Sequence, residues 1–104
     1  AIIDAAKART WTFVRAALAK GCQPVLVTSW PMTGMSGGEL ALLQALDAWA
    51  AETGIPYISP LARYGNSAGA WAGSWGYDSN HGTQALYQRF ADDAAAQLIS
   101  LGYI

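Results

Sequence analysis

Cysteine and histidine are almost absent from the sequence, and their scarcity excludes two classes of site. Cys22 is the only cysteine, so the chain has neither an internal disulfide nor a cysteine-rich metal centre. His81 is the only histidine, and one histidine without a cysteine cluster does not build a zinc site in the usual way. The sequence therefore implies no metal ion and no organic cofactor.

Charged residues and long apolar runs are also sparse. Six lysines and arginines, scattered along the chain, stand against seven acidic residues, which gives a formal net charge of −1. This distribution lacks the basic patch by which proteins hold nucleic acid. No apolar run approaches the roughly 20 residues that a membrane span requires. Neither a nucleic acid nor a membrane is therefore expected as a partner.

Three segments carry apolar residues at the spacing of an α-helix. They are residues 3–20, 39–53 and 83–101. Gly21 and Gly54 are typical stops for the first two. Ser36, with Glu39 three residues later, is a capping pattern for the start of the second. We therefore predict three helices that together span about half of the chain.

Two short apolar runs predict buried strands. Residues 24–30 (PVLVTSW) and 55–59 (IPYIS) are each closed by a proline, Pro31 and Pro60. Strands that alternate with helices indicate parallel crossovers in an α/β sheet. Between the second strand and the last helix, residues 61–82 are rich in glycine, alanine, serine and tryptophan and predict a long loop.

Two strands are too few for a sheet whose strands are apolar on both faces. Such strands need helices over both faces and neighbouring strands at their sides. A two-stranded α/β domain standing alone is the alternative, but it buries little surface. We therefore predict that residues 1–104 are the C-terminal portion of a three-layer α/β/α (flavodoxin-like) domain with a parallel sheet. The expected partner is the missing N-terminal segment of the same domain.

The most reactive residue types lie just ahead of the last helix, where Asp78 and His81 form an Asp-x-x-His pattern. In an open parallel sheet, functional groups gather beyond the C-terminal ends of the strands. A carboxylate across a tight turn can accept a hydrogen bond from one imidazole nitrogen, leaving the other free to take a proton from a hydroxyl. The alternative is that Asp78 or Ser79 caps a turn and His81 is an exposed residue at the helix entrance.

The block DSNHGTQALYQRFADDAAAQLISLGYI resembles the end of the SGNH (GDSL-type) hydrolase family, in which an Asp-x-x-His is followed directly by the C-terminal helix. Upstream, ALAKGCQPVLVTSWP and LDAWAAETGIPYISP resemble that family's preceding helix and strand units. The resemblance covers nearly the whole chain, but only the C-terminal portion of the family's domain. It implies a serine carboxylic-ester hydrolase with His81 as general base and Asp78 as its orienting carboxylate.

The sequence also departs from that family. It contains neither the Gly-Asp-Ser block of the nucleophile nor the Gly-x-Asn-Asp block, and the YGNS at 64–67 follows both strands, so Asn66 is not given that role. Ser29 and Ser59 at the strand ends are expected to satisfy backbone groups, since neither lies in a Gly-x-Ser-x-Gly elbow. The resemblance therefore implies half of a Ser-His-Asp triad, inert alone, with its serine and most of its oxyanion hole outside this chain.

Tryptophans suggest where an ester substrate would lie. Trp30 ends the first strand and is followed by Met32, while Trp71 and Trp75 lie in the long loop, where an exposed ring can stack on a ligand. We predict these four residues as substrate-binding, for a small-molecule or glycan ester such as an acetylated carbohydrate. The alternative is that the loop rings simply pack the loop onto the domain.

A rival hypothesis is a non-enzymatic carbohydrate-binding or structural α/β module that uses Trp30, Trp71 and Trp75.

Trp11 and Trp49 lie on apolar helix faces and are expected in the core. Arg63, just past the second strand, suits either an anionic substrate group or a plain surface position. Cys22 is expected to be a small buried hydrophobe.

Overall fold

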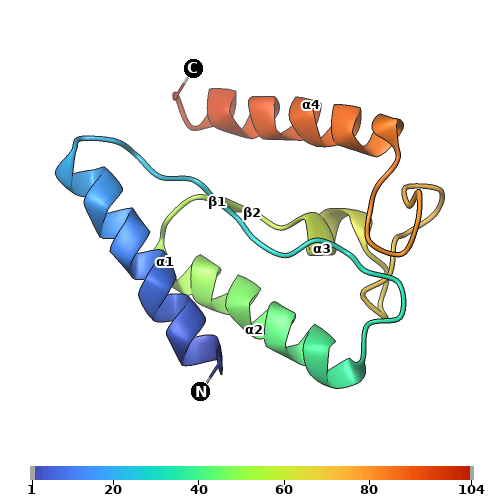
Figure 1. Ribbon diagram of the computed structural model, residues 1–104. Coiled ribbons are helices and arrows are strands. Elements are labelled where there is room, and N and C mark those ends of the chain that lie inside the picture. The colour runs from blue at the N-terminus through green and yellow to red at the C-terminus, as the bar shows by residue number, and fades with distance from the viewer. Residues whose placement is uncertain (1, 104) are drawn as a thin grey trace.

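The computed structural model describes residues 2–103 (Figure 1). Ala1 and Ile104, the two ends of the predicted domain portion, lie outside these residues. The elements, in order, are α1 (Ile2–Ala19), β1 (Leu26–Val27), α2 (Gly37–Thr53), β2 (Tyr57–Ile58), α3 (Pro60–Tyr64) and α4 (Gln84–Ser100). The three predicted helices are confirmed, and the chain is a mixed α/β structure with one parallel strand pair.

The helix ends follow the capping chemistry of the sequence. At the start of α2, the Ser36 hydroxyl accepts a hydrogen bond from the Glu39 amide (3.1 Å), and the Glu39 carboxylate accepts one from the Ser36 amide (3.5 Å). This is the predicted capping box, which satisfies two backbone donors that the helix itself leaves free. Gly54 ends α2 with a φ of 74°, a left-handed conformation that glycine adopts without strain.

The two strands are parallel neighbours, with Leu26 opposite Tyr57 and Val27 opposite Ile58. Each is only two residues long, so the predicted strands at 24–30 and 55–59 were too long. Pairing stops because Ser59 leaves the sheet to cap α3. The expectation that both strands are buried is also wrong for β1, because Val27 is 50% exposed.

A short helix, α3, occupies the start of the segment predicted as loop. The Ser59 hydroxyl accepts a hydrogen bond from the Ala62 amide (3.1 Å), and Pro60 stands at the first helical position. Proline is well suited there because its fixed φ fits a helix and its missing N–H would have had no partner. Pro60 therefore begins a helix here, in addition to ending the strand.

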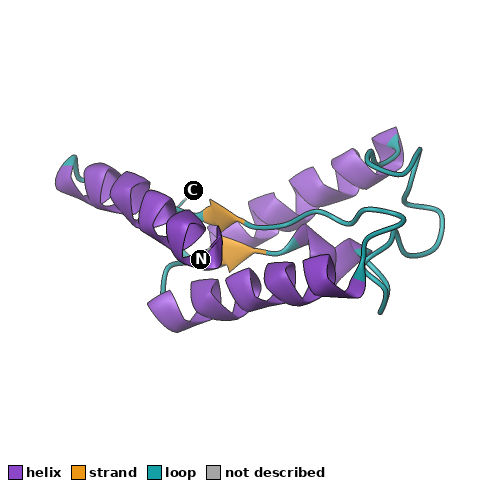
Figure 2. Ribbon diagram, turned by 60° about the horizontal axis from the view of Figure 1, so that its bottom comes forward, coloured by secondary structure: helices purple, strands orange, loops and turns teal. Residues whose placement is uncertain are grey.

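The strand pair lies between helices. Figures 1 and 2 show α2 on one side of the strands and α4 on the other, with α1 crossing α2. The crossing is held by Trp11 and Trp49, whose ring centroids are 6.1 Å apart in an edge-to-face arrangement. Both tryptophans are only partly buried and pack between the two helices, so neither belongs to the buried core in which it was expected.

The tightest packing gathers where α3, the long loop and α4 meet. Tyr64, Trp71 and Leu86 are buried there. Partly buried aromatic side chains surround them: Trp30, Trp75 and Phe90. This cluster, called here the aromatic core, anchors both ends of residues 65–83.

Cys22 contradicts its prediction, because it is exposed. It lies in the turn that ends α1, where its amide donates to the Ala17 carbonyl (2.9 Å) and the Gly21 amide donates to the Leu18 carbonyl (3.0 Å). These bonds close a Schellman-type cap, and Gly21 with a φ of 77° turns the chain outward. The cap therefore places Cys22 at the surface.

Leu86 and Ile99 form a matched pair on α4 for testing the aromatic core. Leu86 has no exposed surface, whereas Ile99 is 61% exposed. Leu86→Ala should lower the free energy of unfolding by about 2–5 kcal/mol, because it removes buried methyl groups and leaves a cavity. Ile99→Ala should change it by about 0.5 kcal/mol or less. Urea unfolding measures both, and equal losses would mean that the core lies elsewhere.

Candidate functional site

Three segments of the chain meet at one end of the strand pair. They follow β1, follow β2 and precede α4, and they lie at the end of the molecule toward which both strands run (Figure 1). Backbone hydrogen bonds join them: Leu61 N to Ser29 O (2.8 Å), Met32 N to Gly69 O (2.9 Å) and Thr33 N to Ser79 O (2.9 Å). Asp78 and His81 lie in the third of these segments.

Asp78 and His81 lie in a tight turn whose backbone folds onto itself. The Tyr77 and Asp78 amides both donate to the His81 carbonyl, at 2.8 and 3.3 Å. The Asp78 Oδ1 in turn accepts from the Asn80 and His81 amides, each at 2.8 Å. A carboxylate that bonds its own backbone two and three residues ahead is the usual way in which aspartate closes a turn.

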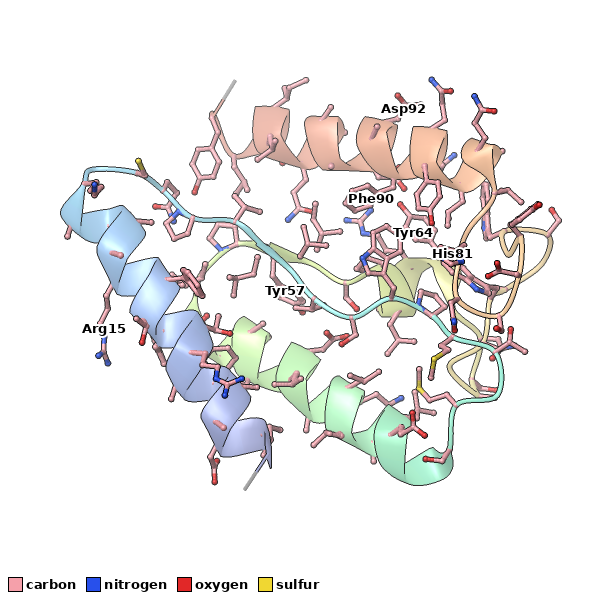
Figure 3. The ribbon with its side chains drawn as sticks, in the orientation of Figure 1. Arg15, Tyr57, Tyr64, His81, Phe90 and Asp92 are labelled. Atoms are coloured by element: carbon pink, nitrogen blue, oxygen red, sulfur yellow. The ribbon has the colours of Figure 1, made fainter. Side chains whose placement is uncertain are left out.

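The same carboxylate also holds the imidazole. The His81 Nδ1 lies 2.9 Å from Asp78 Oδ1 and 3.0 Å from Oδ2. The two side chains are 68% and 49% exposed, respectively, so the pair sits open to solvent in the loop shown in Figure 3. The alternative interpretation of the sequence pattern is confirmed, because Asp78 closes the turn and His81 is exposed, and the predicted contact of the carboxylate with the ring is also present.

The electrostatics of the pair fix which nitrogen is basic. The Asn80 amide, followed by the His81 side chain, holds the pKa of the Asp78 carboxyl below its ordinary value. Near neutral pH, Asp78 is therefore an ionised carboxylate, which only accepts hydrogen bonds. Nδ1 must then carry the proton, and the lone pair of a neutral imidazole is left on Nε2.

Tyr87 is a positioning residue that the sequence analysis missed. Its hydroxyl accepts a hydrogen bond from the Gly82 amide (3.0 Å), the peptide directly after His81. A Cβ at position 82 would lie 2.0 Å from the Leu86 Cδ2, so only glycine fits there. The only signal in the sequence was Gly82 itself, since the approach of Tyr87 depends on the exact start of α4.

The two serines at the strand ends make hydrogen bonds that hold the local structure. Ser59 is buried, and its hydroxyl donates to Asp47 while accepting from the Ala62 amide. The Ser29 carbonyl accepts from the Leu61 amide, which ties the two strand ends together. Within residues 2–103, no serine hydroxyl is hydrogen-bonded to His81. Neither Ser29 nor Ser59 is thus arranged as a nucleophile beside the imidazole.

The side chain of Asn66 shapes the long loop. Its Oδ1 accepts hydrogen bonds from the Ala68 amide (2.9 Å) and the Ala70 amide (3.1 Å). An asparagine that is engaged in this way closes a turn in its own loop. This geometry agrees with leaving Asn66 out of the oxyanion-hole residues.

The residues predicted to bind substrate belong largely to the aromatic core. Trp71 is only 8% exposed, so its ring faces are covered. Trp30 packs on Phe90 with ring centroids 5.0 Å apart, and it is partly buried. Met32 is also partly buried, and its amide ties the loop to Gly69. The plainer interpretation, that these rings fix the loop on the domain, accounts for Trp71 and Trp30.

Trp75 differs from the other loop tryptophan. It packs edge-to-face on Tyr64, with centroids 6.1 Å apart, and it also forms part of the wall of a surface hollow beside α4. The other wall residues are Arg63, Tyr64, Arg89 and Asp93. Trp75 thus lines a surface hollow in addition to packing on the aromatic core.

Comparisons with protein-family models, with curated proteins and with solved structures find no match to this chain. Among residues 2–103, His, Cys, Asp and Glu do not gather in threes or more in a way that could hold a metal ion. None of the helices in that range has the length and apolar character to cross a membrane. The geometry of the Asp78–His81 pair therefore carries the functional argument.

The position of the imidazole proton tests this geometry directly. In the unaltered chain at a pH where His81 is neutral, ¹⁵N-detected NMR should show the proton mainly on Nδ1. An isolated imidazole places it mainly on Nε2, so the Asp78 carboxylate must reverse the preference. Asp78→Asn removes the charged acceptor and should shift the population toward Nε2–H. As a control, Asp92→Asn removes a carboxylate from the exposed face of α4 and should leave the tautomer unchanged.

Proposed function

We propose that this chain supplies the Asp-His half of a serine carboxylic-ester hydrolase of the SGNH type. The observation that supports the proposal most strongly is the contact of both Asp78 carboxylate oxygens with the His81 Nδ1. It lies beyond the C-terminal ends of two parallel strands, where α/β enzymes gather their catalytic groups. The Nε2 of His81 is left available to a hydroxyl.

In the proposed reaction, His81 acts twice. Nε2 first takes the proton of a serine hydroxyl as its oxygen attacks the ester carbonyl, and it then gives that proton to the departing alcohol. Nε2 next takes a proton from water, whose oxygen attacks the acyl-serine, and the proton returns to the serine as the acid leaves. Throughout both steps, Asp78 stabilises the imidazolium and keeps Nδ1 protonated. The serine and the main oxyanion donors come from a segment outside this chain.

The same proposal includes a larger sheet, as in a three-layer α/β/α (flavodoxin-like) domain with this chain as its C-terminal portion. The Leu26 and Thr28 amides point to β2, where they meet the Pro56 and Ile58 carbonyls at 2.9 Å. Along the strand the adjacent amides must face the opposite way. The other edge of β1 therefore presents backbone groups to any strand laid beside it, and Val27 there is 50% exposed.

Apolar side chains lie beside β1 as well. A hollow of about 210 Å³ lies between α1, β1 and α2, with Leu26, Leu46 and Trp49 among its walls. Phe13 on α1 is also exposed, at 77%. By contrast, the far edge of β2 is closed, because the Gln97 side-chain amide donates to the Tyr57 carbonyl (2.9 Å). We propose that the partner segment, the missing N-terminal part of the same domain, adds its strand at β1.

The proposed substrate is a small-molecule or glycan ester, and the proposed reaction uses no cofactor. Proton transfer at Nε2 and a serine nucleophile are sufficient for acyl transfer. A carbohydrate-binding module that uses Trp30, Trp71 and Trp75 is a weaker proposal, because the faces of Trp71 are covered by the aromatic core.

Ester hydrolysis and serine labelling test this function together. The chain is assayed alone and within the polypeptide that its complete gene encodes, with p-nitrophenyl acetate and a fluorophosphonate probe. We expect activity only in the complete polypeptide. There His81→Ala should lower kcat by about 10³-fold or more, because the general base is lost. Asp78→Asn should lower it by about 10²–10⁴-fold through loss of the correct tautomer.

The matched control is Asp92→Asn, which should retain activity within about twofold since Asp92 lies on the exposed face of α4. An inactive complete polypeptide would overturn the esterase proposal. Equal activity of the chain alone would instead show that its nucleophile lies within these residues, against the half-triad account.

A further inference from the structure

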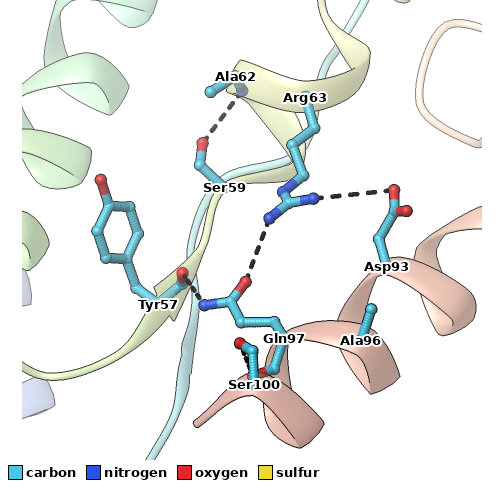
Figure 4. Close-up of a pocket in the computed structure, with 8 residues that line it drawn as sticks. All are labelled: Tyr57, Ser59, Ala62, Arg63, Asp93, Ala96, Gln97 and Ser100. Atoms are coloured by element: carbon cyan, nitrogen blue, oxygen red, sulfur yellow. Dashed lines mark hydrogen bonds and ion pairs between the residues drawn. The ribbon is translucent and has the colours of Figure 1, made fainter.

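Two adjoining hollows form a groove between α3 and α4, and neither Asp78 nor His81 is among their lining residues. One, of about 600 Å³, is lined by residues of β2, α3 and α4, among them Arg63, Asp93, Gln97 and Ser100 (Figure 4). The other, of about 370 Å³, is lined by Arg63, Asp93, Tyr64, Trp75 and Arg89. They share Arg63 and Asp93 as lining residues, and the two together are called here the α3–α4 groove.

Asp93 carries the single carboxylate of the groove, and neighbouring side chains already bind it. Asp93 accepts a hydrogen bond from the Tyr64 hydroxyl (2.6 Å) and is held by the Arg89 Nε at 3.1 and 3.3 Å. These contacts, the tyrosine first, hold the pKa of Asp93 below its ordinary value. Burial and the same hydrogen bond raise the pKa of Tyr64 to about 12. Asp93 is thus an ionised group whose charge is balanced chiefly by Arg89.

The Arg63 guanidinium keeps N–H donors that make no hydrogen bond and a charge that no directly bonded carboxylate balances. Its Nη1 lies 3.9 Å from the Asp93 Oδ2, which is too long for a hydrogen bond. Its Nη2 donates to the Gln97 Oε1 (3.2 Å), and the side chain is 42% exposed. A guanidinium has five N–H donors, so most of those of Arg63 remain for a ligand. Figure 4 shows this group reaching from α3 toward α4 at the centre of the hollow.

Each hollow of the groove is open to solvent and has the volume of a small-molecule site. Volumes of about 300–1,000 Å³ are usual for such sites. Two arginines against one aspartate give the lining a net positive charge. Beside Arg63, the partly buried ring of Trp75 forms an aromatic wall that is backed by the buried Tyr64, and a ligand ring is well suited to pack on such a wall. Arg63 and this wall are reached from the same groove.

We propose that the α3–α4 groove binds a small ring-bearing carboxylate. The carboxylate is held by the Arg63 guanidinium, whose planar fork matches it with two parallel hydrogen bonds. The ring lies against Trp75. Either an aromatic acid or an acidic sugar has this chemistry. The site is separate from Asp78 and His81, so it does not depend on the esterase proposal.

Isothermal titration calorimetry with matched ligands tests the groove. Benzoate represents aromatic acids and glucuronate represents acidic sugars, with benzyl alcohol and glucose as their neutral counterparts. At least one acid should bind more tightly than its neutral counterpart, and the tighter of the two acids identifies the ligand class. Arg63→Gln should weaken that binding by about tenfold or more, because a charged hydrogen-bonding partner is lost. Arg63→Lys should weaken it less, since the charge remains without the fork.

The matched control is Arg9→Gln, which removes an exposed arginine from α1 and should leave binding within about twofold. His81→Ala should also leave binding unchanged, which separates this site from the esterase proposal. If Arg63→Gln does not fold, the salt dependence of ligand binding to the unaltered chain tests the proposal instead. Raising the salt concentration about tenfold should weaken the binding of the acid and leave the binding of its neutral counterpart unchanged. Equal affinity for acids and neutral counterparts, or no effect of Arg63→Gln in a folded protein, would overturn the proposal.

Discussion

The Asp78 carboxylate is the group on which the candidate site depends. It accepts backbone hydrogen bonds from Asn80 and His81 and also contacts the imidazole Nδ1 of His81. Because one ionised group closes the turn and orients the ring, the position of the imidazole is coupled to the fold of the loop. The loop is in turn held by the Ser79 carbonyl, which accepts from Thr33 after β1, and by the Tyr87 hydroxyl at the start of α4.

Outside the candidate site, the small number of strands leaves part of the sheet without a neighbour. β1 and β2 cover each other along one edge only, and Gln97 closes the far edge of β2. Val27 on β1 and Phe13 on α1 stay exposed to solvent. The buried aromatic core lies instead at the end where the loops gather, around Tyr64, Trp71 and Leu86. The buried cluster thus lies at the end of the molecule that carries the candidate site, whereas Val27 is exposed on the strand where the proposed partner segment adds.

Local signals predicted the parts of this structure that local chemistry decides. The helices followed from apolar spacing and from caps such as Ser36 with Glu39, and the contact of Asp78 with His81 followed from their separation of three residues. Features that depend on distant partners escaped prediction. The Tyr87 hydroxyl reaches Gly82 only because α4 starts where it does, and the groove exists because Arg63 on α3 faces Asp93 on α4. The lengths of the two strands were overestimated because an apolar pattern does not report where a strand loses its pairing partner.

The titration of the Asp78 carboxyl tests the central claim most directly, since that claim is that this carboxylate binds backbone and imidazole together. Carboxyl ¹³C chemical shifts against pH should give an Asp78 pKa below the ordinary value of 3.8, because the folded chain favours the charged form. The stability it contributes is then present above that ordinary value and lost as the pH falls through the lowered one. In His81→Ala the pKa should rise only part of the way back, because the Asn80 amide remains. An Asp78 pKa at or above its ordinary value, unmoved by His81→Ala, would contradict the account.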